Sequence, residues 1–117
     1  MKAITLPQPY ASLVGRGKTI ETRSWKTEYR GPVAIHAAKG WTAADRAFAA
    51  SPGVLERVGE ALPLGAVVSA ALLTDCRPTS SIIGQWFKGD AGETERAFGD
   101  YSPGRYGWIF QDIVPVV

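Results

Sequence analysis

Short apolar runs separated by glycine, proline and charged residues recur along the chain, and their periods predict both strands and helices. Residues 19–25 alternate and are rich in β-branched side chains, which is typical of a half-buried strand. Residues 65–73 are almost all apolar, which is typical of a strand buried on both faces. Further strands are expected at 2–6, 33–38 and 106–114.

Helical patterns occur at three places in the first half. Pro9 suits the first turn of a helix, and the apolar residues after it fall at helical spacing until Gly15. Thr42, with Asp45 three residues later, resembles a helix N-cap. A second short helix is expected to begin at Pro52.

The later part of the chain predicts one helical turn and one loop. Residues 80–87 are expected to form the turn, with apolar anchors at Ile82, Ile83, Trp86 and Phe87. Residues 88–104 hold four glycines and mixed charges, which predicts a loop. About five strands with two or three helices, few of them in βαβ spacing, indicate the α+β class with a mixed or barrel-like sheet. A length of 117 residues fits one domain over 1–117.

Composition excludes several classes of protein. Hydrophobic residues make up 45% and charged residues 21%, as in an ordinary globular domain. No apolar run reaches the roughly 18 residues that span a membrane, so no membrane partner is expected. One cysteine, Cys76, and one histidine exclude an internal disulfide and make a zinc site unexpected, which favours a reducing, cytoplasmic location. No nucleotide-binding loop is present, and no cofactor is expected.

Charge is unevenly distributed, although the net charge is only +2. Residues 1–40 hold seven basic and two acidic side chains, a local charge of +5. Residues 41–100 hold five basic and eight acidic side chains. Charge alone therefore favours an ordinary solvated surface over the first third, with a surface that faces phosphates as the alternative.

The densest candidate chemistry lies in residues 17–25 (GKTIETRSW). In a strand, Glu21, Arg23 and Trp25 share one face, whereas Ile20 points to the core. One hypothesis is an exposed strand whose Glu–Arg pair contributes little to stability. The other is a cleft for nucleic acid.

In that cleft, Lys18 and Arg23 would contact phosphates. Trp25 or Tyr10 would stack on a base. Lys18 stands beside two glycines, which allow close approach to the backbone.

Three stretches together resemble the ASCH domain family, named for activating signal cointegrator homology. They are 8–13 (QPYASL), 17–25 (GKTIETRSW) and 29–37 (YRGPVAIHA). The family pattern is a glycine, a spacer, a lysine, two residues, a glutamate, one residue and an arginine, and residues 15–23 match it. Residues 101–108 (YSPGRYGW) resemble the C-terminal part of small bacterial and phage members.

The resemblance implies a PUA-like fold, which is a small mixed β-barrel flanked by two or three short helices, with a positively charged cleft. It also implies binding of nucleic acid, with single-stranded RNA or a modified nucleoside as the partner. The family's lysine, glutamate and arginine correspond to Lys18, Glu21 and Arg23. The residues expected to contact nucleic acid are Lys18, Arg23, Trp25, Tyr10, Arg30, Arg105 and Tyr106.

A small enzyme acting on RNA or nucleosides is the alternative. Some relatives resemble 4-acetylcytidine amidohydrolases, with a lysine, a threonine three residues on and a distant glutamate. Lys18 matches the lysine, but Glu21 occupies the threonine position, and Thr22 would point to the opposite face. The distant glutamate stays open among Glu56, Glu60, Glu93 and Glu95. In a ribonuclease, Glu21 would act as the base and Tyr10 as the proton donor.

Other features have ordinary explanations. His36 alternates with small residues and is expected to be a partly buried structural side chain, with a cleft acid or base as the alternative. Cys76 is expected to be inert, and Trp41 to anchor the core or a helix. Family members often continue with a further strand after the position of Val117. Its absence would expose a barrel edge, so a homodimer is a hypothesis.

Overall fold

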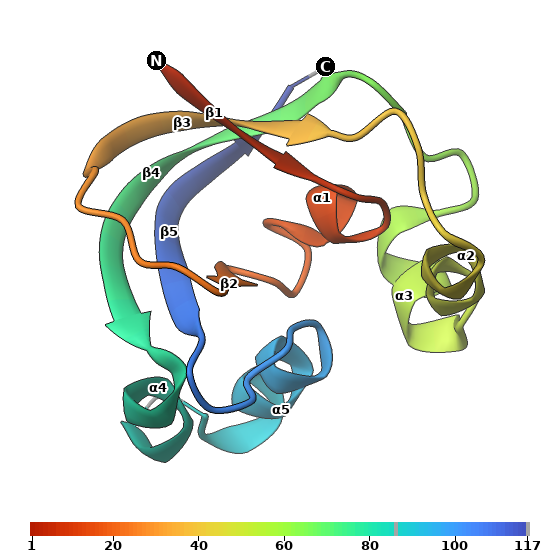
Figure 1. Ribbon diagram of the computed structural model, residues 1–117. Coiled ribbons are helices and arrows are strands. Elements are labelled where there is room, and N and C mark those ends of the chain that lie inside the picture. The colour runs from red at the N-terminus through yellow and green to blue at the C-terminus, as the bar shows by residue number, and fades with distance from the viewer. Residues whose placement is uncertain (86, 117) are drawn as a thin grey trace.

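The strands predicted from the sequence form one curled sheet. The computed structural model describes residues 1–85 and 87–116. The strands are β1 (Lys2–Leu6), β2 (Ile20–Arg23), β3 (Gly31–Ala37), β4 (Val67–Pro78) and β5 (Tyr106–Pro115). Their order is β1-β3-β4-β5-β2, with β1 and β3 parallel and the other neighbours antiparallel. The result is a mixed sheet curled into a half-barrel (Figure 1), which confirms the α+β class.

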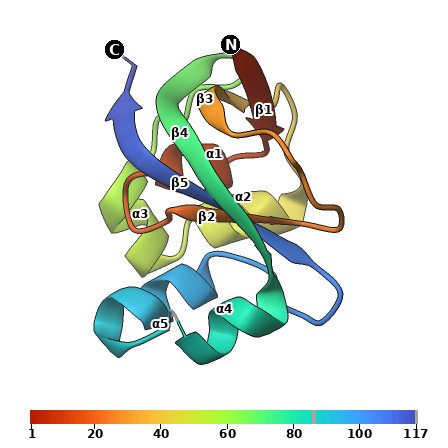
Figure 2. The same cartoon turned by 90° about the vertical axis from the view of Figure 1, so that its left-hand side faces the viewer.

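Short helices surround this sheet. They are α1 (Tyr10–Leu13), α2 (Ala43–Ala49), α3 (Pro52–Val58), α4 (Thr79–Gln85) and α5 (Gly89–Ala97). Helix α1 lies inside the curve of the sheet, and α2 and α3 lie at its open side (Figure 1). Helices α4 and α5 lie together beyond the junction of β4 and β5 (Figures 1 and 2). None of the described helices combines the length and the apolar composition needed to cross a membrane.

The loop predicted at 88–104 is wrong over its first half, because α5 occupies Gly89–Ala97. The glycines that suggested a loop include one with a packing role. A Cβ at Gly92 would lie 2.6 Å from the backbone of Phe87, so this buried helix position requires glycine. The structure therefore has five described helices where the sequence predicted two or three.

Side chains from α1 and the sheet form the main core. It contains Ile4, Leu6, Ala11, Val14, Val33, Ile35, Ala37, Ala71, Leu73, Trp108 and Phe110. A second cluster joins α1 to α3 and to Phe98, and a third joins β2 and β5 to α4. The predicted N-cap of α2 is confirmed, because Thr42 and Asp45 exchange side-chain to backbone hydrogen bonds of 3.0 and 3.1 Å.

One sequence-based expectation about the sheet is wrong. Strand β4 was expected to be buried on both faces, but its alternate residues Ser69, Ala71 and Leu73 are buried while their neighbours are partly exposed. The reason is that one face of the curled sheet packs on the core while the other remains accessible. Strand β5 lies between β4 and β2, so the sheet edges are β1 and β2 rather than the C-terminal strand. A homodimer stays a prediction.

Candidate functional site

Lys18 is fully buried, with 0% of its surface exposed. Its Nζ donates to the carbonyl oxygens of Ile20 at 2.7 Å and Phe98 at 2.9 Å. The same ammonium lies 3.4 Å from Oε1 of Glu21. Gly17 precedes it with φ of 109°, and a Cβ there would lie 3.1 Å from the Phe98 ring. The Lys18 ammonium is therefore not accessible to a phosphate at the surface in this structure. It pairs instead with the Glu21 carboxylate.

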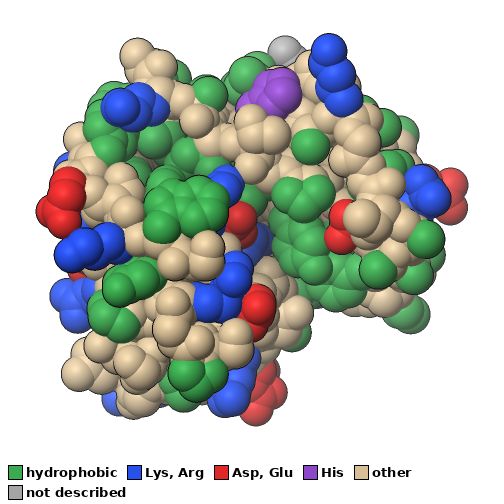
Figure 3. Space-filling model, in the orientation of Figure 1, with side chains coloured by type: hydrophobic (Ala, Val, Ile, Leu, Met, Phe, Trp, Pro, Cys, Tyr) green, Lys and Arg blue, Asp and Glu red, His purple; other side chains and the backbone are tan. Residues whose placement is uncertain are grey.

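Glu21 faces a pocket of about 300 Å³. The pocket is lined by Pro7, Tyr10, Glu21, Thr22, Phe48, Ala97, Phe98, Gly99, Asp100 and Arg105. Burial alternates along β2 as the sequence predicted, with Ile20 and Thr22 buried and Glu21 and Arg23 partly exposed. Figure 3 shows this face of the molecule hollowed, with acidic and basic side chains beside hydrophobic ones.

Aromatic rings form one wall of the pocket. The rings of Tyr10 and Phe48 are stacked with centroids 5.4 Å apart, and Lys18 Nζ lies 5.9 Å from the Tyr10 centroid. Burial, and then the charges of Asp45 and Glu21, raise the pKa of the Tyr10 phenol above 10.0. Tyr10 therefore remains a neutral hydrogen-bond donor at physiological pH.

Another wall of the pocket is the segment that contains Asp100 and Arg105, which forms hydrogen bonds to β2. Arg105 Nη2 donates to the Thr22 carbonyl at 3.0 Å, and its Nε donates to the Asp100 carbonyl at 3.1 Å. Thr22 Oγ1 accepts a 3.2 Å hydrogen bond from Asp100 N, and Thr22 is buried whereas its neighbour Glu21 is partly exposed, as the strand alternation predicts. Hydrogen bonds from Ser102 hold the pKa of the exposed Asp100 carboxyl below its usual value. Two carboxylates and one guanidinium thus line a pocket of mixed charge.

Two further candidates lie outside the pocket lining, Arg23 at the end of β2 and Trp25 two residues beyond it. The Arg23 guanidinium lies beside two indoles that pack edge-on against each other, 5.3 Å from the Trp25 ring and 5.5 Å from the Trp108 ring. Its Nη2 donates to the Thr5 carbonyl at 2.8 Å. Trp25 is 54% exposed, although Trp108 Nε1 donates to its carbonyl at 3.1 Å. This arrangement holds a large apolar ring in solvent beside a fixed cation.

The remaining two candidates are not at the pocket. Arg30 donates to the carbonyls of Thr27 and Tyr29, and it lies 3.9 Å from Asp75. Tyr106 pairs with Arg23 in the β2–β5 ladder and packs against the main core. Neither side chain is among the lining residues.

Glu95, one of the four glutamates left open by the sequence, supports β2 from outside the pocket. It is 7% exposed, and its carboxylate accepts hydrogen bonds of 2.8 to 2.9 Å from Thr19 N, Thr19 Oγ1 and Ile20 N. A carboxylate on α5 thus fixes the start of β2. The only available signal was helical spacing, with Gly92, Glu95 and Phe98 three residues apart.

The set expected for an amidohydrolase is not assembled in the pocket. Glu95 lies behind β2 and does not line it. The three other candidate glutamates, Glu56, Glu60 and Glu93, are exposed and do not line it either. Within the described residues, no three His, Cys, Asp or Glu side chains gather as a metal site.

His36, Cys76 and Trp41 do not line the pocket. His36 is partly buried, as expected, with Nδ1 3.3 Å from Thr5 Oγ1. Cys76 is partly buried against the main core. Trp41 is partly buried. The anchor expected at Trp86 lies outside the described residues, whereas Phe87 packs edge-on against Tyr101 at 4.7 Å.

Comparison with known proteins adds no family to this geometry. No protein-family model matches the chain, and no curated protein matches it significantly.

Tyr101 predicts a loss of stability at high pH. Its hydroxyl is buried without a partner in the described structure. Burial, and then the charges of Glu95 and Glu21, raise the pKa of this phenol well above 10.0. The unfolded state ionises near pH 10, whereas the folded state does not, so the free energy of unfolding falls as pH rises above that value.

Tyr101→Phe removes both the unsatisfied hydroxyl and the ionisation. We expect it to be neutral or to stabilise the protein by up to about 1 kcal/mol at pH 8, and to reduce the alkaline loss. Urea denaturation at pH 8 and pH 10.5 measures both effects. An unchanged loss between the two pH values in the variant would contradict the assignment.

Proposed function

We propose that this chain is an ASCH-type domain with a PUA-like fold that binds single-stranded RNA or a modified nucleoside. One base enters the pocket beside Tyr10 and Glu21. The observation that carries the proposal is the exposed Trp25 ring, held beside the Arg23 guanidinium just beyond the end of β2, the strand whose Glu21 and Thr22 line the pocket.

The pocket offers what a single base requires. Its volume of about 300 Å³ is at the lower end of small-molecule sites. The Tyr10 ring offers a stacking surface. The Glu21 carboxylate accepts from amino or imino groups of a base edge, whereas Tyr10 and Arg105 carry donors for its carbonyl oxygens.

Outside the pocket, the neighbouring nucleotides would meet Trp25 and Arg23. Stacking on an exposed indole tolerates any base, because every base has a π-face. Arg23 uses one of its donors on Thr5, and a guanidinium has five in total. The basic first third of the chain supports a phosphate contact here, and the mixed charge of the pocket favours a base rather than a phosphate inside it.

Trp25→Ala should weaken binding of a labelled single-stranded RNA by roughly tenfold, because base–indole stacking contributes about 1–3 kcal/mol. Fluorescence anisotropy at several salt concentrations measures this. Arg23→Gln should weaken binding and reduce its salt dependence. Leu64→Ala, a second exposed apolar side chain that does not line the pocket, is the control and should bind as the wild type does.

Equal affinities for all four proteins would overturn the proposal. A fourth variant, Glu21→Gln, tests for catalysis. Glu21 is the candidate because its carboxylate pairs with the buried Lys18 ammonium. Turnover of RNA or acylated cytidine that Glu21→Gln abolishes while binding persists would assign an enzyme instead.

A further inference from the structure

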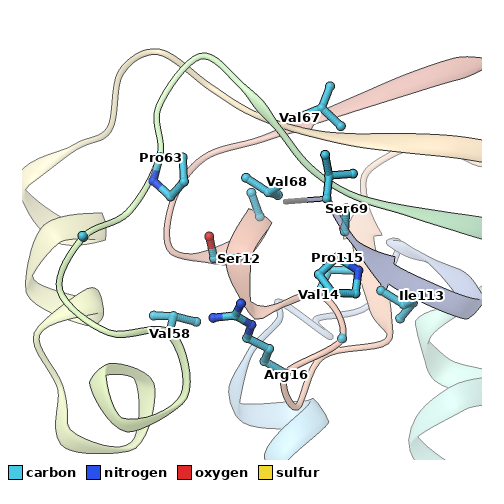
Figure 4. A pocket seen from close by; sticks show the side chains of 14 residues that line it. Ser12, Val14, Arg16, Val58, Pro63, Val67, Val68, Ser69, Ile113 and Pro115 are labelled. Atoms are coloured by element: carbon cyan, nitrogen blue, oxygen red, sulfur yellow. The ribbon is translucent and has the colours of Figure 1, made fainter.

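A second pocket lies between α1, the end of α3, the start of β4 and the end of β5 (Figure 4). Its volume is about 260 Å³, and it shares no lining residue with the pocket at Glu21. None of its fourteen lining residues is acidic. It is therefore a separate site with its own chemistry.

The walls of this second pocket are mostly aliphatic. Val14, Val58, Val68, Ile113 and Pro115 lie around the space in Figure 4. The rim contains Val67 and Val116, whose side chains are 42% and 50% exposed. Covering these exposed valines with an apolar group would remove apolar surface from water, which is energetically favourable.

Three polar groups interrupt the apolar lining, and each has unused donor capacity. The Arg16 guanidinium extends toward the space (Figure 4), and its side chain has no hydrogen bond or ion pair among the described residues. Ser12 Oγ accepts from Gln8 Nε2 at 2.8 Å, which leaves the hydroxyl proton available. Ser69 is 3% exposed, and its buried Oγ has no partner in the described structure.

The lining combines a guanidinium, a hydroxyl donor and an aliphatic wall without acids. This combination fits an anion that carries an apolar group. The cation and the hydroxyl suit a carboxylate, which Arg binds through paired N–H donors. The aliphatic wall suits a short branched hydrocarbon group. Because a cavity of about 150 Å³ accommodates benzene, a space of about 260 Å³ admits a branched group of similar size together with its carboxylate.

We infer that this second pocket binds a small carboxylate with a branched aliphatic group. The carboxylate would lie against Arg16 and Ser12, and the hydrocarbon against Val58 and Val68. The inference does not depend on the proposed binding of RNA, since no residue is shared between the two pockets.

The test is an NMR titration of the ¹⁵N-labelled protein with 3-methylbutanoate and, as a neutral analogue, 3-methylbutanol. The acid should shift amide signals around the second pocket and bind more tightly than the alcohol. Arg16→Gln should lower the affinity for the acid by roughly fivefold or more and leave the affinity for the alcohol unchanged. Arg96→Gln, an exposed arginine on α5 outside the lining, is the matched control.

A second arm identifies the source of the carboxylate. The peptide acetyl-Gly-Gly-Val is titrated with a free and with an amidated C-terminus. Binding of the free peptide alone supports a peptide C-terminus as the ligand, and binding only of 3-methylbutanoate supports a free acid. Equal affinity for acid and alcohol, wild-type affinity of Arg16→Gln for the acid, or no binding of any probe would overturn the inference.

Discussion

Replacing Lys18 by methionine should lower the free energy of unfolding by about 3 to 4 kcal/mol. Methionine keeps an unbranched side chain, one heavy atom shorter than that of lysine, and removes the ammonium. The Glu21 carboxylate then loses the cation at 3.4 Å, and the carbonyls of Ile20 and Phe98 lose their donor. Breaking a buried pair by removing one partner costs more than the pair contributes, because a charge is left without compensation. Urea denaturation at pH 7 measures the loss.

Two variants separate this cause from a general packing defect. Lys18→Met combined with Glu21→Gln should be less destabilised than Lys18→Met alone, since no uncompensated carboxylate remains. Lys26→Met, at an exposed lysine, should change stability by no more than about 0.5 kcal/mol. Wild-type stability of Lys18→Met would show that the ammonium is not buried.

Glu95→Ala should lower the free energy of unfolding by about 2 to 3 kcal/mol and also weaken RNA binding. The variant leaves the backbone N–H groups of Thr19 and Ile20 without their acceptor, and a buried unsatisfied donor costs about 1 to 3 kcal/mol. Binding weakens because β2 loses its attachment to α5. Urea denaturation gives the first quantity, and fluorescence anisotropy gives the second.

A neighbour on the same helix serves as the control for Glu95. Glu93→Ala changes the same residue type at an exposed position and should stay within about 0.5 kcal/mol of the wild type. Faster hydrogen exchange at the Ile20 amide in Glu95→Ala, but not in Glu93→Ala, would locate the effect at the start of β2. Equal stability of the two variants would contradict the role of Glu95.

The strands were largely predictable because alternation and β-branched composition are local properties. Strand β1 begins and ends where the sequence predicted, and the alternation along β2 is observed. Helix α5 could not be predicted from the sequence, because its glycines are typical of a loop. Gly92 is needed for a different reason, since the backbone of Phe87 leaves no room for a Cβ there.

The candidate site was predictable only in part, for the same reason. The strand period placed Glu21, Arg23 and Trp25 on one face. No local pattern indicates that Lys18 is buried, because one of its acceptors, the Phe98 carbonyl, lies 80 residues away. The wall residue Phe48 likewise comes from α2, far from β2 in the sequence.

Strand β2 lies at an edge of the sheet and has a neighbour on one side only, β5. Two buried side chains compensate for the missing strand, and both bind mainly main-chain atoms. Lys18 donates to the carbonyls of Ile20 and Phe98, and Glu95 accepts from the amides of Thr19 and Ile20. The position of the strand therefore depends mainly on main-chain contacts at its start. Substitution at position 23 or 25 would change the proposed contacts with RNA while these main-chain contacts stay in place.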